Sequence, residues 1–583
     1  MRHLLLIAMS SALLAACTST PSPAPVEAVV APPEPEVVEA PERAIPAESV
    51  YPLLVAEFAI RRQDYQTALD HYLAQAGMLE DAGVSSHTTH LAQFVQDSEQ
   101  ALQAVQLWLQ EEPDSLEANN TAATLLARAN RPEEALPHMS FVARAGKQAN
   151  FPLLLQGFDQ LTAAQQSQLV QGLNELAIEF PEDPALLLTL ALINTEFKQY
   201  DQALTRLDTL FEVEPYQHQA LLLEARILVQ TEAKKPFARI EQALETNPED
   251  ARLRLEYARL LTRTDIETAR EQFEVLSQQS PEDADLLLSL ALISREIDDD
   301  LTAKAYLEQV LETGKRSDEA FYYLGRIAED EKQLQEALSN YMQIGDSRQY
   351  LAANQRIGQI LVAGGELDAS HAWFEQQRQQ VPTRSEQLFG IEAEVLSSAG
   401  ALEASLAVLN AGISAYPDSA SLRYARSMLG QQQSDLALME ADLRAILSRD
   451  PNNATALNAL GYTLADQTDR VDEAYALISR ALALDPEEPA ILDSMGWVLF
   501  RKGEMEQSIS YLTQAYAAFP DAEVAAHLGE VLWANGDTDK ARQIWQGALF
   551  KAPNHPVLRA TLQRLGVTDL NTLPPSLPGT ETD

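Results

Sequence analysis

The sequence predicts an all-α solenoid, in which short helix-turn-helix units are stacked one upon another. Prolines that close apolar segments recur from Pro113 to Pro553 at intervals of 33 to 35 residues, or at close to two or three times 34. Between these prolines the apolar residues follow helical spacing in two runs. The stretch that begins at Pro181 returns almost unchanged at Pro281. A fixed period of this length is the signature of a repeat protein.

The first sixteen residues have the pattern of a secretory signal peptide. A positively charged start is followed by residues 4–16, which are uncharged and largely apolar. This stretch is too short to span a bilayer as a helix. It leads into LAAC at residues 14–17, which resembles the bacterial lipobox, and Cys17 is the only cysteine of the chain. The resemblance implies cleavage between Ala16 and Cys17 and acylation of Cys17. The alternative is a plain signal peptide beside an incidental cysteine.

Residues 17–49 are expected to form a lipidated tether. Thr18 follows the cysteine, where the sorting rule of Gram-negative lipoproteins retains Asp in the inner membrane. The rule therefore implies an outer-membrane protein that faces the periplasm. Eight prolines lie between Thr18 and Pro46, with Glu and Ala between them and no aromatic residue. Such a chain is extended and semi-rigid, so it would hold the body away from the membrane; a leader with no mechanical role is the alternative.

Charge excludes several classes of partner. The chain has 583 residues, with 42 Lys and Arg against 86 Asp and Glu, a formal net charge of −44. A chain this acidic repels phosphate backbones, so we expect no nucleic-acid binding. It is equally unsuited to lying on an anionic membrane surface, which leaves the N-terminal lipid as its membrane contact. A single cysteine excludes a disulfide framework and a cysteine-rich metal site.

The body divides into degenerate repeats at 50–318 and well-formed repeats at 319–566, followed by a tail at 567–583 that is expected to be disordered. Small residues recur where two helices must approach closely. The glycines at these places are Gly325, Gly461, Gly496 and Gly529. Each costs about 1 kcal/mol of helix propensity, so its recurrence indicates tight packing. The pattern is poorest at 140–180, where glycines fall out of phase.

The best-formed unit resembles the tetratricopeptide repeat (TPR). That family expects Leu-Gly in the first helix, then Ala, a bulky residue, a second Ala and a closing Pro. The corresponding residues here are Leu528, Gly529, Ala541, Trp545, Ala548 and Pro553. The resemblance implies a right-handed superhelical solenoid of TPR helix-turn-helix repeats. It covers about 320 to 566 well and 50 to 318 more weakly.

A solenoid of this kind leaves a long concave surface made by one face of each first helix. Large aromatic residues beside polar groups on that surface are typical of a protein-binding hot spot. The residues expected to face this groove are Asn458, Tyr462, Asp493, Trp497, Phe500, Arg501, Glu530 and Trp533. The alternative for Trp497 and Trp533 is that they pack against the next repeat.

The sequence contains no pattern that indicates an enzyme. We find no nucleophile elbow, no phosphate-binding glycine loop and no zinc-protease motif. His87 and His90 are the only histidines close together, and no third metal ligand lies near them. We therefore expect no catalytic residues, no metal, no cofactor and no small-molecule substrate.

A lipobox, a Pro/Glu tether and repeats across nearly the whole body together resemble the lipoprotein adaptors of carboxyl-terminal processing proteases, the LbcA type. The resemblance implies an adaptor that binds and activates such a protease of the periplasm and presents substrates to it, among them peptidoglycan hydrolases. The alternative is a scaffold for an outer-membrane secretion, pilus or polysaccharide-export machine. A third class, an enzyme acting on cell-wall glycan or peptide, is disfavoured because no non-repeat segment is long enough for a catalytic domain.

Overall fold

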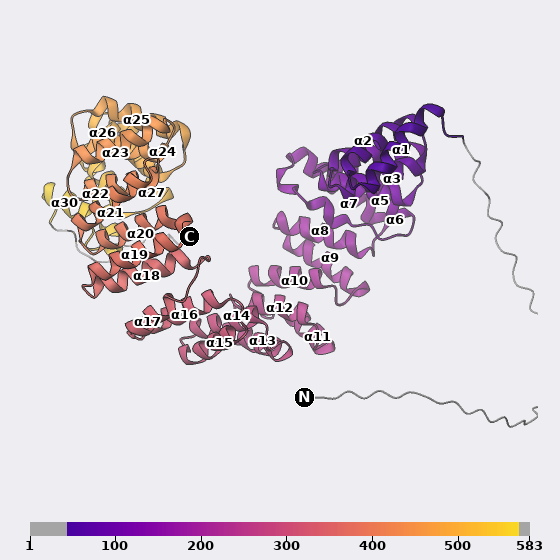
Figure 1. The fold of residues 1–583 in the computed structure, drawn as a ribbon, viewed down its shortest axis with the longest axis horizontal. Helices are drawn as coiled ribbons and strands as arrows, with labels where there is room; N and C mark the ends of the chain where they lie inside the picture. Colours follow the sequence, from indigo (N-terminus) through magenta and orange to yellow (C-terminus); the bar gives the residue numbers. More distant parts are fainter. Residues whose placement is uncertain (1–43, 569, 571–583) are drawn as a thin grey trace, which may run out of the picture. The chain divides into compact units, whose positions relative to one another are not determined.

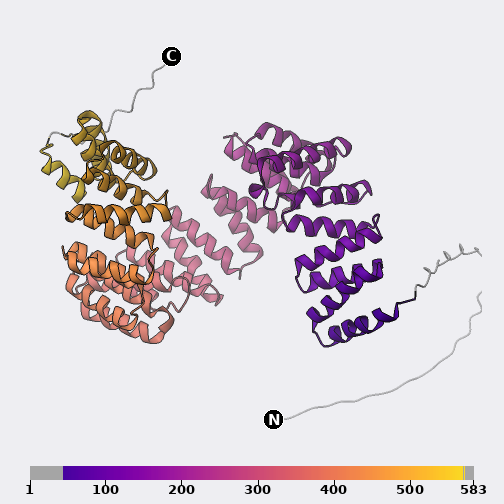
Figure 2. The same ribbon diagram turned by 90° about the horizontal axis from the view of Figure 1, so that it is seen from above.

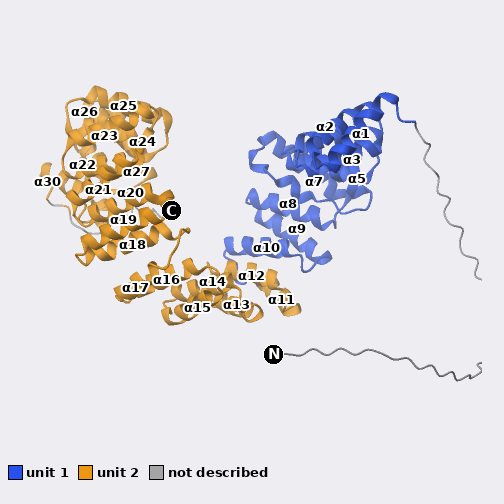
Figure 3. Ribbon diagram, viewed as in Figure 1, with its two compact units in different colours: residues 1–237 blue, residues 238–583 orange. Residues whose placement is uncertain are grey.

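The computed structural model describes residues 44–568 and residue 570. The chain divides into two compact units, of which the first ends at Phe237 and the second begins at Ala238; Figure 3 shows them in blue and orange. The described residues form thirty α-helices and three short 3₁₀ helices, and they include no strand. The predicted all-α solenoid of helix-turn-helix repeats is confirmed in each unit.

The first unit contains α1 to α10 and two of the 3₁₀ helices, labelled in Figure 1 where there is room. Their bounds are α1 Ala47–Arg61, α2 Tyr65–Leu79, α3 Ala82–Phe94, α4 Ser98–Glu111, α5 Leu116–Arg128, α6 Pro132–Arg144, η1 Phe151–Leu155, η2 Phe158–Gln160, α7 Ala163–Glu179, α8 Pro184–Glu196, α9 Tyr200–Val213 and α10 His218–Gln230.

The second unit contains α11 to α30 and the third 3₁₀ helix. Their bounds are α11 Ala238–Thr246, α12 Ala251–Leu261, α13 Ile266–Gln279, α14 Ala284–Glu296, α15 Asp300–Glu312, α16 Ser317–Asp330, α17 Leu334–Tyr341, α18 Tyr350–Ala363, α19 Leu367–Gln380, η3 Pro382–Arg384, α20 Ser385–Ser398, α21 Leu402–Ala415, α22 Ala420–Gln432, α23 Leu436–Arg449, α24 Ala454–Gln467, α25 Val471–Leu484, α26 Pro489–Lys502, α27 Met505–Ala518, α28 Ala522–Asn535, α29 Thr538–Lys551 and α30 Pro556–Arg564.

Helices pack as consecutive pairs joined by short turns, for example α24 with α25 and α26 with α27. Within each unit, neighbouring pairs also pack against one another, and Figure 2 shows the resulting layers in the orange part of the second unit. A pair cannot bury its apolar face alone, so the core lies between neighbouring pairs. This packing fixes which face of each first helix remains free.

The recurrent Pro-x-Asp turn determines where several first helices begin. The Asp183 carboxylate accepts a hydrogen bond from the backbone N–H of Leu186 at 2.9 Å, at the start of α8. Asp283 does the same for Leu286 at 3.3 Å, at the start of α14. A carboxylate at this place satisfies a free N–H and interacts favourably with the helix dipole. The repeated stretch therefore combines a proline that ends one helix with an aspartate that begins the next.

The close approach expected at the repeat glycines is present in all four units. A Cβ added at each glycine would lie within 2.5 Å of a side-chain atom on the second helix of its own pair. The pairs are Gly325 with Tyr341, Gly461 with Ile478, Gly496 with Leu512 and Gly529 with Trp545. These glycines let the two helices pack closer than any side chain would allow.

The region that fits the repeat pattern least, residues 140–180, has no ordinary first helix. Two short 3₁₀ helices, η1 and η2, occupy the chain between α6 and α7. Gly157 has φ +71° directly before η2, in the left-handed region that favours glycine. Gly172 lies on α7, where a Cβ would fall 2.6 Å from Leu136 Cδ2. Phe151 is fully buried in the same core. The region is a degenerate repeat with a packed interior.

The described chain departs from the expected boundaries at both ends. Helix α1 begins at Ala47 rather than at residue 50, and Ser49 within it is buried. Val567, expected to begin a disordered tail, is buried against the core around α28 and α30. Ala16 and Cys17, with the rest of 1–43, and residues 571–583 lie outside the described residues. Among the described helices, none is long and apolar enough to cross a bilayer.

Candidate protein-binding groove

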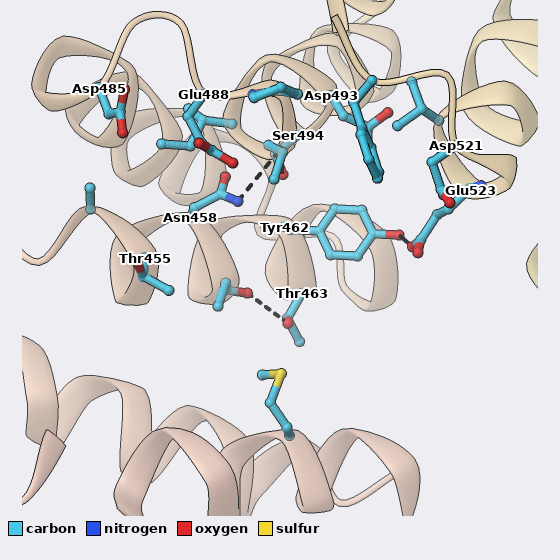
Figure 4. Close-up of a pocket in the computed structure, with 18 of the residues that line it drawn as sticks. Thr455, Asn458, Tyr462, Thr463, Asp485, Glu488, Asp493, Ser494, Asp521 and Glu523 are labelled. Carbon is cyan, nitrogen blue, oxygen red and sulfur yellow. Dashed lines mark hydrogen bonds between the residues drawn. The ribbon is translucent and has the colours of Figure 1, made fainter. Parts of the chain in front are cut away.

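A groove crosses the first helices of four consecutive pairs in the second unit. It has a volume of about 800 Å³ and is lined mainly by α22, α24, α26 and α28, with the turns before α26 and α28. We call it the α22–α28 groove. First helices form the inner surface of a helix-pair solenoid, so their exposed side chains converge there. Figure 4 shows α24 crossing the groove, with residues of α26 and of the turn before α28 beside it.

Three of the eight residues expected in a groove line it, namely Asn458, Tyr462 and Asp493. The Asn458 side chain donates from Nδ2 to the backbone carbonyl of Ala490 at 3.4 Å. Its Oδ1 is buried and has no hydrogen-bond partner among the described residues. The Tyr462 ring reaches toward α28, as Figure 4 shows. These residues therefore connect α24 to both of the following first helices.

Trp497 does not face the groove, and the prediction that it does is wrong. Its side chain is buried, with only 6 % of the residue exposed. The indole ring stacks on the imidazole of His527 on α28, with centroids 4.5 Å apart and planes 27° apart. Trp497 thus packs against the next repeat, which was the alternative reading of the sequence. Helical spacing predicts that Trp497 lies on the first helix α26, as it does, but its side chain packs against α28 and does not enter the groove.

Arg501 and Glu530 also have structural partners and do not line the groove. The Arg501 guanidinium donates to backbone carbonyls at the C-terminal end of α24, including that of Asp466 at 3.1 Å. Carbonyls there lack partners within the helix, so the arginine caps it. Glu530 is buried and accepts two hydrogen bonds from Arg564 on α30, both at 2.6 Å. Neither side chain is free for a partner protein.

Phe500 and Trp533 are only partly buried, but both pack on the apolar core around α28 and α29. The ring of Phe500 lies 5.4 Å from that of Trp497, and the ring of Trp533 lies 5.7 Å from that of Trp545. Neither lines the groove. Trp533 therefore packs on α29, the second helix of its own pair, and not in the groove.

A buried hydrogen-bonded chain supports the groove wall. His527 Nδ1 lies 2.9 Å from Asp493 Oδ2, and its Nε2 lies 3.3 Å from the Tyr462 hydroxyl. The same hydroxyl donates to Glu523 Oε1 at 3.1 Å. Ionised carboxylates only accept hydrogen bonds. The three contacts are therefore satisfied together when His527 carries both ring protons and donates from both nitrogens.

The surrounding charges favour that protonated form. Burial alone lowers the pKa of His527, but the adjacent Asp493 carboxylate, with Glu523 and Asp466 nearby, outweighs it and raises the pKa. Burial, reinforced by Glu523, also raises the pKa of the Tyr462 hydroxyl far above its ordinary value. Tyr462 therefore stays protonated and can keep donating to Glu523. The chain fixes two carboxylates, those of Asp493 and Glu523, at the groove surface.

The sequence did not predict the groove residues that lie in the turns between repeats. Five carboxylates line the groove, and three of them stand outside the chain just described. These three are Asp485, Glu488 and Asp521. They lie in the turns beside the closing prolines, whereas helical spacing predicts only residues on the helices. The acidic residues that flank Pro486 and Pro520 were the available signal. Phe519, 58 % exposed, was missed for the same reason.

Comparison with known proteins gives several similar chains. Among solved structures, a thermophilic TPR protein of Thermus thermophilus is 20 % identical and covers 31 % of this chain and 100 % of its own, with a TM-score of 0.29. Yeast Tom70 is 14 % identical and covers 88 % of this chain and 99 % of its own, with a TM-score of 0.31. The model of the tetratricopeptide repeat family matches residues 425–489 and 494–556, which contain most of the groove.

A relative of similar length comes from Pseudomonas aeruginosa, the TPR repeat-containing protein PA4667. The two chains are 38 % identical over 525 residues, which is 89 % of this chain and 88 % of the relative. Identity at this level over nearly the full length of both chains requires the same succession of repeats. This protein therefore belongs to the family of TPR repeat-containing proteins that includes PA4667.

Proposed function

We propose that this protein is a lipid-anchored adaptor of the periplasm, which binds and activates a carboxyl-terminal processing protease and presents protein substrates to it. TPR arrays act by binding other proteins, so the chain is a protein-binding scaffold. The α22–α28 groove is the observation that carries the proposal. It opens on four successive first helices, the surface on which repeat proteins hold extended segments.

Two further features support the finer assignment. The N-terminal sequence resembles a lipobox followed by a Pro/Glu tether, which would place the array in the periplasm at the outer membrane. The combination resembles the LbcA type of adaptor. Peptidoglycan hydrolases are the substrates that this resemblance implies. In such a system one part of the array holds the protease and the groove holds a substrate, so each raises the effective concentration of the other.

The test is a reconstitution with purified proteins. The mature chain without its lipid, starting at Thr18, is mixed with the carboxyl-terminal processing protease of the same organism and a peptidoglycan hydrolase. We expect the chain to bind both and to speed cleavage of the hydrolase. A chain that binds neither protein, but is recovered from cells with components of a secretion, pilus or polysaccharide-export channel, would instead be an assembly scaffold.

A matched pair of variants tests the role of the groove in the same assay. Glu488→Lys reverses a charge that lines the groove, and Glu506→Lys reverses an exposed charge on the second helix α27. Both changes alter the net charge equally. If the groove holds the substrate, Glu488→Lys slows cleavage of the hydrolase and Glu506→Lys does not. Equal rates for both variants and the wild type would remove the groove from the mechanism.

A further inference from the structure

The electrostatic character of the α22–α28 groove points to the kind of protein segment that it holds. Its lining contains the carboxylates of Asp485, Glu488, Asp493, Asp521 and Glu523, and it contains no Lys, Arg or His. A cavity walled by one sign of charge concentrates ligands of the opposite sign and speeds their association. The lining thus favours a segment with positive side chains.

Excess acid in the chain does not by itself explain this arrangement. Several carboxylates elsewhere on the second unit are paired with arginine; Glu440, for example, binds Arg470 at 2.8 Å, and Glu473 binds Arg444 at 2.5 Å. Among the described residues, no ion pair with Lys or Arg is formed by Asp485 or Glu488. Both side chains are exposed at the mouth of the groove. Their charges are available to a partner.

Two of the carboxylates are held in place before any partner arrives. Glu523 accepts the Tyr462 hydroxyl at 3.1 Å, and Asp493 accepts the imidazole of His527 at 2.9 Å. His527 is buried and does not line the groove, so it holds Asp493 without occupying space that a partner would fill. Groups that are already ordered lose little side-chain entropy on binding, which strengthens the complex.

The groove also has an apolar component. Its lining includes Tyr424, Met428, Ile491 and Val524, together with Phe519, a residue that is 58 % exposed. Methionine side chains adapt to irregular apolar partners. A fitting segment therefore carries aliphatic or aromatic side chains between its positive ones.

The surface is long enough for an extended chain. A second cavity of about 710 Å³ adjoins the groove, shares Tyr424 and Met428 with it, and continues onto α20. Its lining adds the carboxylates of Glu386 and Glu394 and again includes no Lys, Arg or His. The same chemistry thus continues along the first helices from α28 to α20.

From these observations we propose that the α22–α28 groove selects an extended, basic and partly apolar segment of a partner protein. The inference rests on the proposed function, because it names the class of segment by which the adaptor recognises its substrate. Charged Lys and Arg heads would meet the exposed carboxylates of Asp485 and Glu488 first, while their neighbours fill the surface around Met428 and Phe519. Attraction of this kind weakens as salt screens it.

The experiment measures binding of a labelled peptide to the mature chain without its lipid by fluorescence anisotropy. The probe has about fifteen residues of alternating Lys and Leu, which extended reach roughly 50 Å. A second probe has Glu in place of Lys. We expect the Lys probe to bind, with lower affinity at higher salt, and the Glu probe not to bind.

Two double variants distinguish binding in the groove from general attraction to an acidic protein, because each removes two negative charges from a different place. Asp485→Asn with Glu488→Gln removes two of the five negative charges of the groove, and Glu506→Gln with Asp539→Asn removes two exposed charges on α27 and α29. We expect the groove variant to weaken binding of the Lys probe about tenfold, and the control to stay within about twofold of wild type. Equal losses in both variants, or none in either, would overturn the inference.

The outcome is distinguishable from failure of the proposed function. If the Lys probe depends on the groove but the chain does not speed cleavage by the protease, the adaptor function fails and the groove assignment stands. If the chain activates the protease and the Asp485→Asn, Glu488→Gln variant presents substrates at the wild-type rate, the groove assignment fails and the adaptor function stands.

Discussion

Gly529 on α28 and Trp545 on α29 are in such close contact that any side chain at Gly529 would overlap the indole ring. Trp545 is fully buried and held in the core, so it cannot move aside. We predict that Gly529→Ala destabilises the C-terminal repeats by about 2 kcal/mol or more, because overpacking forces side chains off their preferred rotamers. Urea unfolding followed by circular dichroism measures the change.

Gly547 provides the control for this prediction. It lies inside α29, and a Cβ there would meet nothing within 4 Å. Gly547→Ala should therefore be neutral or stabilise the helix by up to about 1 kcal/mol. If both substitutions shifted the unfolding midpoint in the same direction, close packing would not be the reason for glycine at position 529.

We predict that Trp497→Ala acts on stability and not on partner recognition. The side chain is buried and stacked on His527, so its loss should cost about 3–5 kcal/mol. Trp497→Phe keeps an aromatic ring there and should cost less. Differential scanning calorimetry gives the loss, and peptide binding is then measured at a temperature where the variant is folded. A fully stable Trp497→Ala protein that no longer binds would contradict the placement of Trp497 in the core.

The stability of the C-terminal repeats should depend on pH through His527. Its pKa is raised in the folded protein, because the carboxylates of Asp493, Glu523 and Asp466 outweigh burial. The imidazolium therefore stabilises the fold fully below the unfolded pKa of about 6.5, and this contribution is lost as the pH rises through the higher folded pKa. The neutral Tyr462 hydroxyl adds no charge in this range.

The measurement is the melting temperature as a function of pH, for wild type and for His527→Gln. The glutamine amide can still donate to Asp493 but does not titrate, so the difference between the two proteins should shrink above the folded pKa of His527. His87→Gln, at an exposed site in the first unit, serves as the control. A constant difference between wild type and His527→Gln at all pH values would show that His527 is not protonated in the fold.

The N-terminal assignment predicts that Cys17→Ser abolishes lipid attachment. Metabolic labelling with radioactive palmitate should mark the wild type and leave the variant unmarked, and the variant should move from the outer-membrane fraction to another fraction. Because acyl chains supply the membrane affinity, the array itself should be unaffected. Incorporation of label into the Cys17→Ser protein would mean that another residue carries the lipid.

The fold was predictable because the residues that determine how two helices pack lie within one repeat and recur in each repeat. The glycine in the first helix, the alanines and bulky residue in the second and the closing proline recur in phase, and at Gly461 and Gly496 the structure has the close approach that they require. Where the phase fails, at 140–180, no ordinary first helix forms. Periodicity therefore predicts the repeats well and their degenerate members poorly.

The candidate groove was predictable only in part. Helical spacing placed Asn458, Tyr462 and Asp493 on its surface, but spacing alone cannot separate the exposed face of a first helix from the face that meets the next repeat. Trp497 belongs to the second face because its partner, His527, lies on another helix. The acidic turn residues were missed since their convergence depends on how successive pairs stack.

The most direct test of the adaptor function is the rate at which the purified carboxyl-terminal processing protease cleaves a peptidoglycan hydrolase, with and without the mature chain. We predict that the chain co-elutes with both proteins in size-exclusion chromatography and that cleavage is at least about tenfold faster in its presence, as expected when two partners share one scaffold. Separate elution of the three proteins, together with an unchanged rate of cleavage, would contradict it.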